Sequence, residues 1–149
     1  MPVIILKTMI NAPIGRCFDL SRSIDLHLQS MKSSGEKAIA GKNSGLINLG
    51  ESVTWRARHF GISFEMTNRI ATLEYPTFFI DEMIKGPFKK LNHQHQFKRI
   101  GYQTEMIDVF EFCAPFGLLG WLAEKLFLKN YMLKLIEERN KAIKFQAER

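Results

Sequence analysis

From residue 52 to residue 113, apolar and polar side chains alternate along the chain, and glycines or prolines interrupt the alternation. Successive side chains of a strand point to opposite faces, so this alternation indicates half-buried β-strands. The interruptions are typical of turns between neighbouring strands. The pattern therefore predicts an antiparallel meander whose strands cover residues 52–60, 62–73, 77–85, 91–100 and 103–113.

The N-terminal part predicts one strand followed by two short helices. Val3–Asn11 is apolar and rich in β-branched residues, which indicates a strand. A short helix is expected over residues 14–20, and Ser23 or Asp25 could cap a second one. Residues 30–50, where Ser, Gly, Lys and Asn accumulate, predict a long loop that carries one short strand.

The C-terminal part predicts one long helix, over about residues 117–146. Lys125 and Arg139 interrupt an apolar stripe that otherwise follows the helical period. So wide a stripe must be covered, and the only large partner is the sheet, which has to curve around the helix. The stripe consists of Leu118, Trp121, Leu122, Leu128, Met132, Leu135, Ile136 and Ile143.

These elements predict a single α+β domain over residues 1–149. Its fold class is a helix-grip, in which a curved antiparallel sheet of six or seven strands wraps a long C-terminal helix. Two short helices follow the first strand.

Several short phrases of the sequence resemble one family. Asn11-Ala-Pro, followed by Cys17-Phe18-Asp19-Leu20, resembles the strand-to-helix entry of the START-like (SRPBCC) superfamily. This superfamily includes the major birch pollen allergen and polyketide cyclase/dehydrase-like proteins. Phrases that resemble its bacterial ligand-binding members are Gly45-Leu, Gly50-Glu-Ser-Val-Thr-Trp55, Phe79-Ile-Asp81-Glu, Gly86-Pro-Phe88, His93-Gln-His95-Gln-Phe97 and Thr104-Glu-Met106-Ile-Asp108.

The resemblance covers essentially the whole chain. It implies the helix-grip fold and a cavity that accepts lipids, sterols, polyketides or similar compounds. It implies no particular reaction, because the superfamily contains both binders and enzymes.

His93-x-His95 is the sharpest candidate for chemistry, since residues two apart on a strand share a face. If the last two strands pair across Gly101, His95 comes near Asp108 of the neighbouring strand. Two histidines and one carboxylate could bind zinc or non-haem iron. Alternatively, His95 and Asp108 could act as a catalytic acid/base pair on a carbonyl compound. A third reading, which we favour, is a buried hydrogen-bonded network that orients a ligand or stabilises the sheet.

Asp81 is expected to face inward with Phe79 and Met83, whereas an ordinary acid at the strand edge is the alternative. We expect neither a metal nor a cofactor, because no phosphate-binding glycine loop, nucleophile elbow or paired-cysteine motif is present. The side chains expected to line the cavity are Trp55, His59, Phe64, Met66, Phe79, Asp81, His93, His95, Phe97, Thr104, Met106, Phe110, Leu122 and Met132.

The net charge of +6 is spread along the chain without a Lys/Arg run, so we expect no nucleic-acid partner. Two isolated cysteines, Cys17 and Cys113, and the lack of a signal peptide predict a cytoplasmic protein. No apolar run is long enough for stable membrane insertion. The apolar segment Phe116–Leu122 could gate the cavity or touch a membrane, but we favour a core role.

The function that the sequence favours is binding or transport of a small apolar ligand: a lipid, a polyketide-like compound or an aromatic compound. The alternative is a cyclase or isomerase that uses His95 and Asp108. A third class, an interaction module that docks a protein, predicts an exposed apolar patch and no cavity. The sequence leaves the oligomeric state open.

Overall fold

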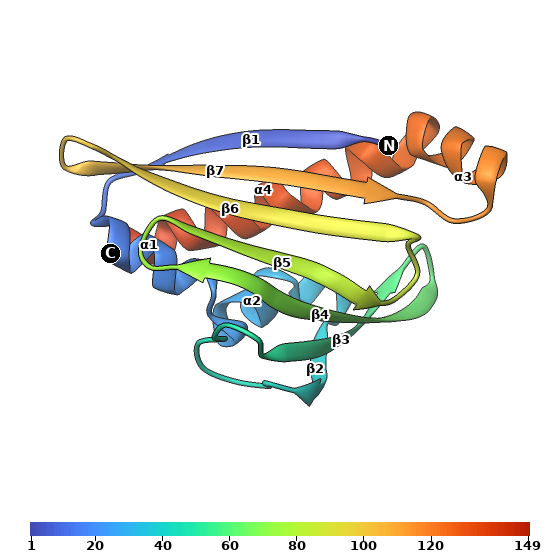
Figure 1. The fold of residues 1–149 in the computed structure, drawn as a ribbon, viewed down its shortest axis with the longest axis horizontal. Coiled ribbons are helices and arrows are strands. Elements are labelled where there is room, and N and C mark those ends of the chain that lie inside the picture. Colours follow the sequence, from blue (N-terminus) through green and yellow to red (C-terminus); the bar gives the residue numbers. More distant parts are fainter.

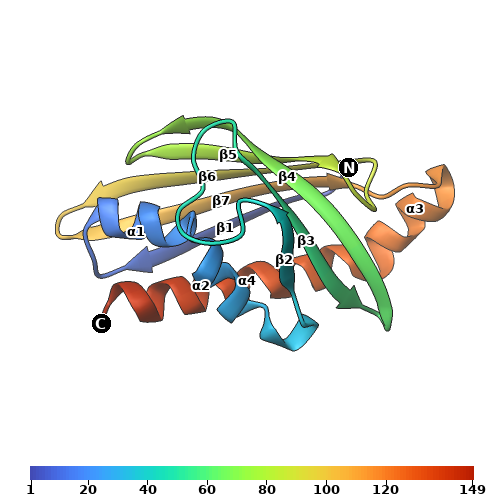
Figure 2. The same ribbon diagram turned by 90° about the horizontal axis from the view of Figure 1, so that it is seen from below.

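The computed structural model describes all residues from 1 to 149, and its main element is a seven-stranded antiparallel sheet with the strand order β1-β7-β6-β5-β4-β3-β2. Figures 1 and 2 show the sheet bending around the C-terminal helix. The predicted helix-grip fold is therefore confirmed. The strands are β1 (Val3–Ile10), β2 (Lys37–Gly41), β3 (Ser52–His59), β4 (Ile62–Glu74), β5 (Phe78–Lys85), β6 (Lys90–Ile100) and β7 (Gln103–Cys113).

Two short helices, α1 (Ile14–Ser21) and α2 (Ile24–Ser30), follow β1 and lie against the long helix (Figure 2). Ser23 is the cap of α2, because its hydroxyl accepts a hydrogen bond from the Leu26 amide at 3.2 Å. A single 3₁₀ turn, η1 (Lys32–Ser34), leads into β2, the one short strand of the long loop. These helices close one end of the space inside the curved sheet.

The register of the meander decides which side chains meet on the inner face. β6 and β7 pair so that His93 lies opposite Phe110 and His95 lies opposite Asp108. On the other side of β6, Asp81 of β5 lies opposite His93. Alternate residues of these strands are buried, as expected for a sheet with one face against the core. Three neighbouring strands therefore bring polar side chains to one place.

The C-terminal helix is continuous but not regular. It consists of α3 (Gly117–Ala123), one π-helical turn, η2 (Glu124–Leu128), and α4 (Lys129–Ala147). A π turn holds an extra residue, so the face of α3 is rotated relative to that of α4. As a result Leu118 and Leu122 are 76% and 45% exposed. The prediction that Leu118 and Leu122 lie on the covered face of the helix is therefore wrong. The core role expected for Phe116–Leu122 is wrong for the same reason.

Two contacts fix this rotation of α3. The Glu124 carboxylate is buried and accepts a hydrogen bond from the Ala114 amide at 2.6 Å. Gly120 lies so close to Pro115 that a β-carbon on it would be only 2.0 Å from the Pro115 carbonyl oxygen. The helix can therefore approach the end of β7 only with Gly120 turned toward it. α3 itself extends past the end of the sheet (Figure 1).

Candidate functional site

A pocket of about 500 Å³ lies between the inner face of the sheet and the C-terminal helix, and it extends from α2 to α3. Hydrophobic residues make up 24 of its 37 lining residues, so the pocket suits a mainly apolar occupant. Of the residues that the sequence places in such a cavity, those that line the pocket are Trp55, His59, Phe64, Met66, Phe79, Asp81, His93, Phe110 and Met132.

Three other expected lining residues lie outside the pocket because α1 covers them. Phe97 packs against the ring of Phe18 with centroids 5.3 Å apart. Thr104 is fully buried and donates a hydrogen bond to the Ala12 carbonyl at 2.8 Å. Met106 is equally buried in the core cluster that contains Phe18. The expectation that these three line the pocket is therefore wrong.

Leu122 and His95 are also outside the pocket, for two different reasons. The π turn rotates Leu122 toward the outside of α3. His95 is 2% exposed and lies between two rings, with its centroid 4.0 Å from that of Phe79 and 3.8 Å from that of His93. Both neighbouring rings line the pocket, so His95 forms the layer behind them.

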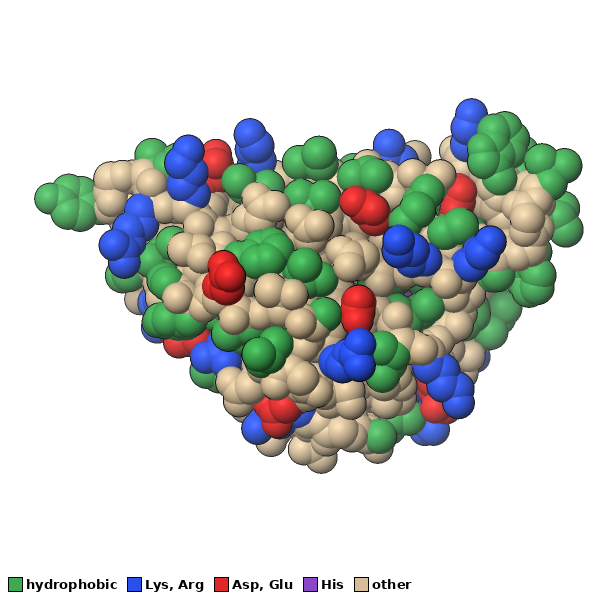
Figure 3. Space-filling model, viewed as in Figure 1, with side chains coloured by type: hydrophobic (Ala, Val, Ile, Leu, Met, Phe, Trp, Pro, Cys, Tyr) green, Lys and Arg blue, Asp and Glu red, His purple; other side chains and the backbone are tan.

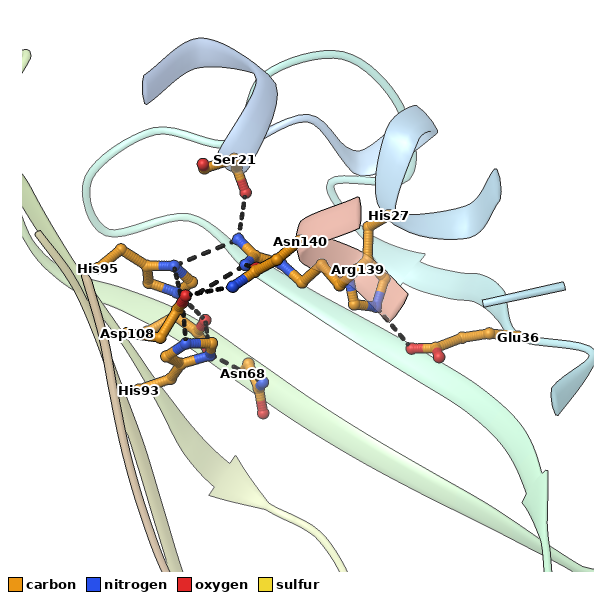
Figure 4. A network of polar contacts seen from close by, with 10 residues as sticks. Ser21, His27, Glu36, Asn68, His93, His95, Asp108, Arg139 and Asn140 are labelled. Atoms are coloured by element: carbon orange, nitrogen blue, oxygen red, sulfur yellow. Dashed lines mark hydrogen bonds and ion pairs between the residues drawn. The ribbon is translucent and has the colours of Figure 1, made fainter. Parts of the chain in front are cut away.

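Asp108 is the centre of a buried polar cluster (Figure 4). Its Oδ1 atom accepts a hydrogen bond from His93 Nε2 at 2.7 Å, and its Oδ2 atom accepts one from Asn140 at 2.7 Å. The Arg139 guanidinium, which reaches in from α4, is 3.5 Å from Oδ1. Burial alone would raise the pKa of Asp108, but the hydrogen bond from His93 and the charge of Arg139 hold it well below its usual range. Asp108 is therefore a buried carboxylate with its partners in place.

His95 is held neutral by the same surroundings. Arg139 Nη2 donates to His95 Nδ1 at 3.2 Å, so the ring proton is on Nε2, which donates to Asp81 Oδ2 at 3.0 Å. Burial, reinforced by the proximity of His93, lowers the pKa of His95 to about 3. His95 and Asp108 are both sealed from the pocket, and the expected catalytic pair therefore cannot reach a ligand.

His93, Asp81 and Arg139 are the titratable members of the cluster that do line the pocket. Since Nε2 of His93 faces Asp108, its other ring nitrogen, Nδ1, lies on the side of Asp81, 4.0 Å from Oδ2. Burial works to raise the pKa of Asp81, but the hydrogen bond from His95 and the nearby positive charge hold it below its usual value. The pocket thus meets an ionised carboxylate and, beside it, the Nδ1 atom of the His93 ring.

Asn68 of β4 completes this polar end of the pocket. Its Nδ2 atom donates to Asp81 Oδ1 at 3.0 Å. Its Oδ1 atom is buried and has no hydrogen-bond partner. Every other buried side-chain nitrogen or oxygen in the chain has one. A buried acceptor without a donor costs about 1–3 kcal/mol, which a suitable ligand group would recover. Asn68 and Asp81 therefore present hydrogen-bond acceptors to a ligand.

Donor atoms of Asp81, His93 and His95 lie within 4.8 Å of one another, a spacing that could hold a metal ion. The hydrogen bonds argue against that use. Because Arg139 donates to His95 Nδ1, the Nε2 atom of His95 carries a proton and has no lone pair for a metal. A cation would also lie close to the Arg139 guanidinium. This donor set fits a hydrogen-bonded network better than a metal centre.

Sequence reasoning missed three members of the cluster. Arg139 left one signal, because it interrupts the apolar stripe of the C-terminal helix. Asn68 shares the strand face of Phe64 and Met66, where a polar residue is unexpected. Asn140 gave no signal, since an asparagine on a helix surface is ordinary and only the structure shows it bonded to Asp108.

The fold can be compared with known structures. No family model and no curated protein matches the sequence. A protein of Thermus thermophilus superposes with a TM-score of 0.79 at 16% identity, covering 98% of this chain and 97% of the other. A START superfamily protein from Mycobacterium smegmatis superposes with a TM-score of 0.72 at 13% identity, covering 98% and 97%. The fold is that of the START-like superfamily.

The START-like fold also includes the Zhui aromatase/cyclase from a Streptomyces species, which superposes with a TM-score of 0.79 at 10% identity. That match covers 99% of this chain and 94% of the other. Identities this low establish the START-like architecture and leave the ligand to be argued from the pocket itself. No helix of the chain combines the length and the apolar character that a membrane span requires.

Proposed function

We propose that this START-like chain binds a small, mainly apolar molecule that carries at least one hydrogen-bond donor, such as a hydroxylated lipid, polyketide or aromatic compound. The observation that carries this proposal is the pocket of about 500 Å³, with its mainly hydrophobic lining and the polar group formed by Asn68, Asp81 and His93. Pockets of roughly 300–1,000 Å³ bind small molecules in other proteins. The apolar lining supports affinity for the body of the ligand.

The donor requirement follows from what the polar end offers. Asn68 Oδ1 has no partner, and Asp81 is an ionised carboxylate. Both groups accept hydrogen bonds, so a ligand hydroxyl is matched there. The one strong donor beside them, the Arg139 guanidinium, already uses both Nη atoms for Asn140, the Ser21 carbonyl and His95, so a ligand that ends in a bare carbonyl is matched less well. A site built for a donor discriminates strongly against an analogue that lacks one.

The test uses two ligands of similar shape that differ in one donor, 2-naphthol and 2-methoxynaphthalene. Each is titrated against the protein by displacement of 8-anilinonaphthalene-1-sulfonate fluorescence. We expect 2-naphthol to bind about tenfold more tightly, the ratio that corresponds to one buried hydrogen bond. In Asn68→Leu the preference should shrink, whereas Thr54→Val, on the outer face of β3, should keep it. Equal binding of both compounds, or binding of neither, would contradict the proposal.

A co-purified molecule would identify the natural ligand. Native mass spectrometry of the protein purified from its own source should show an adduct that is lost on organic extraction. The extracted compound should carry a hydroxyl or amine group. An adduct that contains no donor group would leave ligand binding intact and overturn the donor requirement.

A second candidate function is catalysis, and one observation favours it: His93 lines the pocket and donates through Nε2 to the buried Asp108, while its Nδ1 lies on the side of Asp81. Asp108 thereby fixes the imidazole tautomer, as a general base requires. A START-like aromatase/cyclase exists in Streptomyces, so the fold accommodates such chemistry. In this reading His93 would remove a proton next to a carbonyl group, with Asp81 beside it.

Proton exchange tests the catalytic candidate directly. Deuterium uptake by the α-carbons of 2-tetralone in D₂O is followed by NMR with and without protein. Catalysis predicts an uptake rate above that of buffer, and a loss of about 10²-fold or more in His93→Gln. Uptake that equals the buffer rate, or that His93→Gln leaves unchanged, would reject this candidate and leave the binding proposal standing.

A further inference from the structure

The surface of α3 and η2 carries bulky apolar side chains that nothing covers. Phe116, Leu118 and Leu119 are 82%, 76% and 73% exposed, and Leu126 of the next turn is 67% exposed. Figure 3 shows hydrophobic side chains gathered over α3, at the end of the molecule that projects beyond the sheet. We call Phe116, Leu118, Leu119, Leu122 and Leu126 the end patch. A patch of large apolar residues on a protruding helix is typical of an interaction site.

The end patch is continuous with the mouth of the pocket. Phe116 and Leu119 belong to the patch and also line the pocket. Across the opening, the ring of Phe60 in the β3–β4 turn is 5.5 Å from that of Phe127. Phe60 is itself exposed and lines the same end. An apolar molecule could therefore pass between the patch and the pocket along an apolar surface.

The exposed charges of the segment that carries the patch are all positive. Between residues 114 and 136 the only acidic residue is Glu124, which is buried and bonded to the Ala114 amide. The same segment carries exposed Lys125, Lys129 and Lys134. The β5–β6 connection adds Lys89, whose amide bonds the Cys113 carbonyl just before α3 begins, and the adjacent Lys90. An apolar patch with several exposed lysines nearby is complementary to a surface that has an apolar interior and negatively charged groups outside it.

A bilayer with anionic headgroups has these two properties. Trp121, which is half exposed beside the patch with Lys125 Nζ 4.4 Å from its ring centroid, suits the headgroup region. We propose that the end patch docks the protein peripherally on an anionic membrane, with the pocket mouth facing the lipid. A second copy of the chain fits less well, because pairing two such patches would bring their lysines close to one another.

Vesicle flotation with the full chain tests the docking. The probes are vesicles of neutral phosphatidylcholine alone and vesicles in which about 30% of the lipid is anionic phosphatidylglycerol. The protein should float with the anionic vesicles at low salt, and 0.5 M NaCl should lower the bound fraction strongly. Absence of flotation with anionic vesicles at low salt would overturn the proposal.

Matched variants separate the patch from general stickiness. The double variant Leu118→Gln/Leu126→Gln keeps the charge and changes two exposed residues that do not line the pocket. It should bind about tenfold less tightly to anionic vesicles. The control Ile5→Gln/Tyr102→Gln, which changes exposed residues elsewhere, should bind as the unmodified chain does. Equal loss in both double variants would also overturn the proposal.

Two further readouts make the result specific. Lys125→Gln/Lys129→Gln should lose the preference for anionic over neutral vesicles while the apolar contact remains. Light scattering after size exclusion should give a monomer mass at the same concentration. A dimer that Leu118→Gln/Leu126→Gln dissociates would mean that a second copy covers the patch, and the membrane proposal would fail. Neither readout depends on the pocket ligand, so failure here leaves the proposed binding function untouched.

Discussion

Asp108 accepts a hydrogen bond from His93 Nε2 at 2.7 Å although the Asp108 side chain has no exposed surface. Arg139 supplies the positive charge that offsets the carboxylate. Because the carboxylate holds β7 to β6 through His93 and to α4 through Asn140, it connects the sheet to the helix that the sheet surrounds. This connection lies directly behind the polar end of the pocket.

Asp108→Asn should lower the free energy of unfolding by about 3–5 kcal/mol, because it leaves the Arg139 charge buried without its counter-ion. Urea denaturation followed by circular dichroism measures the change. The matched control is Glu82→Gln, which removes an exposed ion pair with Arg69 and should cost less than about 1 kcal/mol. Asp108→Asn with a stability within about 0.5 kcal/mol of the unmodified chain would show that this carboxylate is not a structural anchor.

The protein should lose stability as the pH falls from 6.5 toward 3. In the unfolded chain a histidine titrates near 6.5, whereas in the folded chain the pKa of His95 is about 3. Between these values the unfolded state binds the proton and the folded state does not, so unfolding gains up to about 1.4 kcal/mol per pH unit. Burial also lowers the pKa of His59, which acts in the same direction.

Denaturation curves at several pH values between 7.5 and 4 measure this dependence. His95→Gln removes the titrating group. As the pH is lowered, the free energy of unfolding of this variant should therefore decrease less steeply than that of the unmodified chain, even if the variant is less stable at every pH. Identical slopes for the two proteins would mean that His95 is not the neutral, buried histidine described above.

Gly120→Ala should destabilise the protein by about 1–3 kcal/mol, because the added β-carbon would lie 2.0 Å from the Pro115 carbonyl oxygen. The direction of this change in stability is informative, because replacing glycine with alanine in a helix normally raises stability by about 1 kcal/mol. Leu118→Ala, on the exposed side of the same helix, should change stability by no more than about 0.5 kcal/mol. A gain in melting temperature for Gly120→Ala would refute this packing of α3.

Thr104→Val should cost about 1–2 kcal/mol of stability and leave ligand binding unchanged. The substitution preserves the shape of a fully buried side chain but removes its hydrogen bond to the Ala12 carbonyl. Because α1 separates Thr104 from the pocket, the affinity for 2-naphthol should stay within about twofold of its original value, a difference too small to reflect a lost contact. A large change in affinity without a change in stability would place Thr104 in the site after all.

The strands and their inner faces could be predicted from the sequence because a period of two, with glycine and proline at the turns, determines them locally. β7 begins and ends as predicted, at Gln103 and Cys113. The proximity of His95 and Asp108 followed from the same pattern, and the register places them opposite each other.

Ring directions could not be predicted in the same way. The sequence gives no information on whether His93 or His95 donates to Asp108, since that depends on how Arg139 and Asn140 approach from a helix far along the chain. The coverage of Phe97 and Met106 by α1 likewise depends on tertiary packing. The π turn had no signature in the sequence, and the phase of α3 was therefore predicted incorrectly.

The single π turn at Glu124–Leu128 rotates α3 about the helix axis relative to α4. Shortening it by one residue would restore the ordinary pitch and swing the preceding segment by about 100° around the axis. Leu118 would then turn inward, and Glu124 would lose its place beside Ala114. One residue of helix length thus decides which of the apolar side chains of α3 face the solvent.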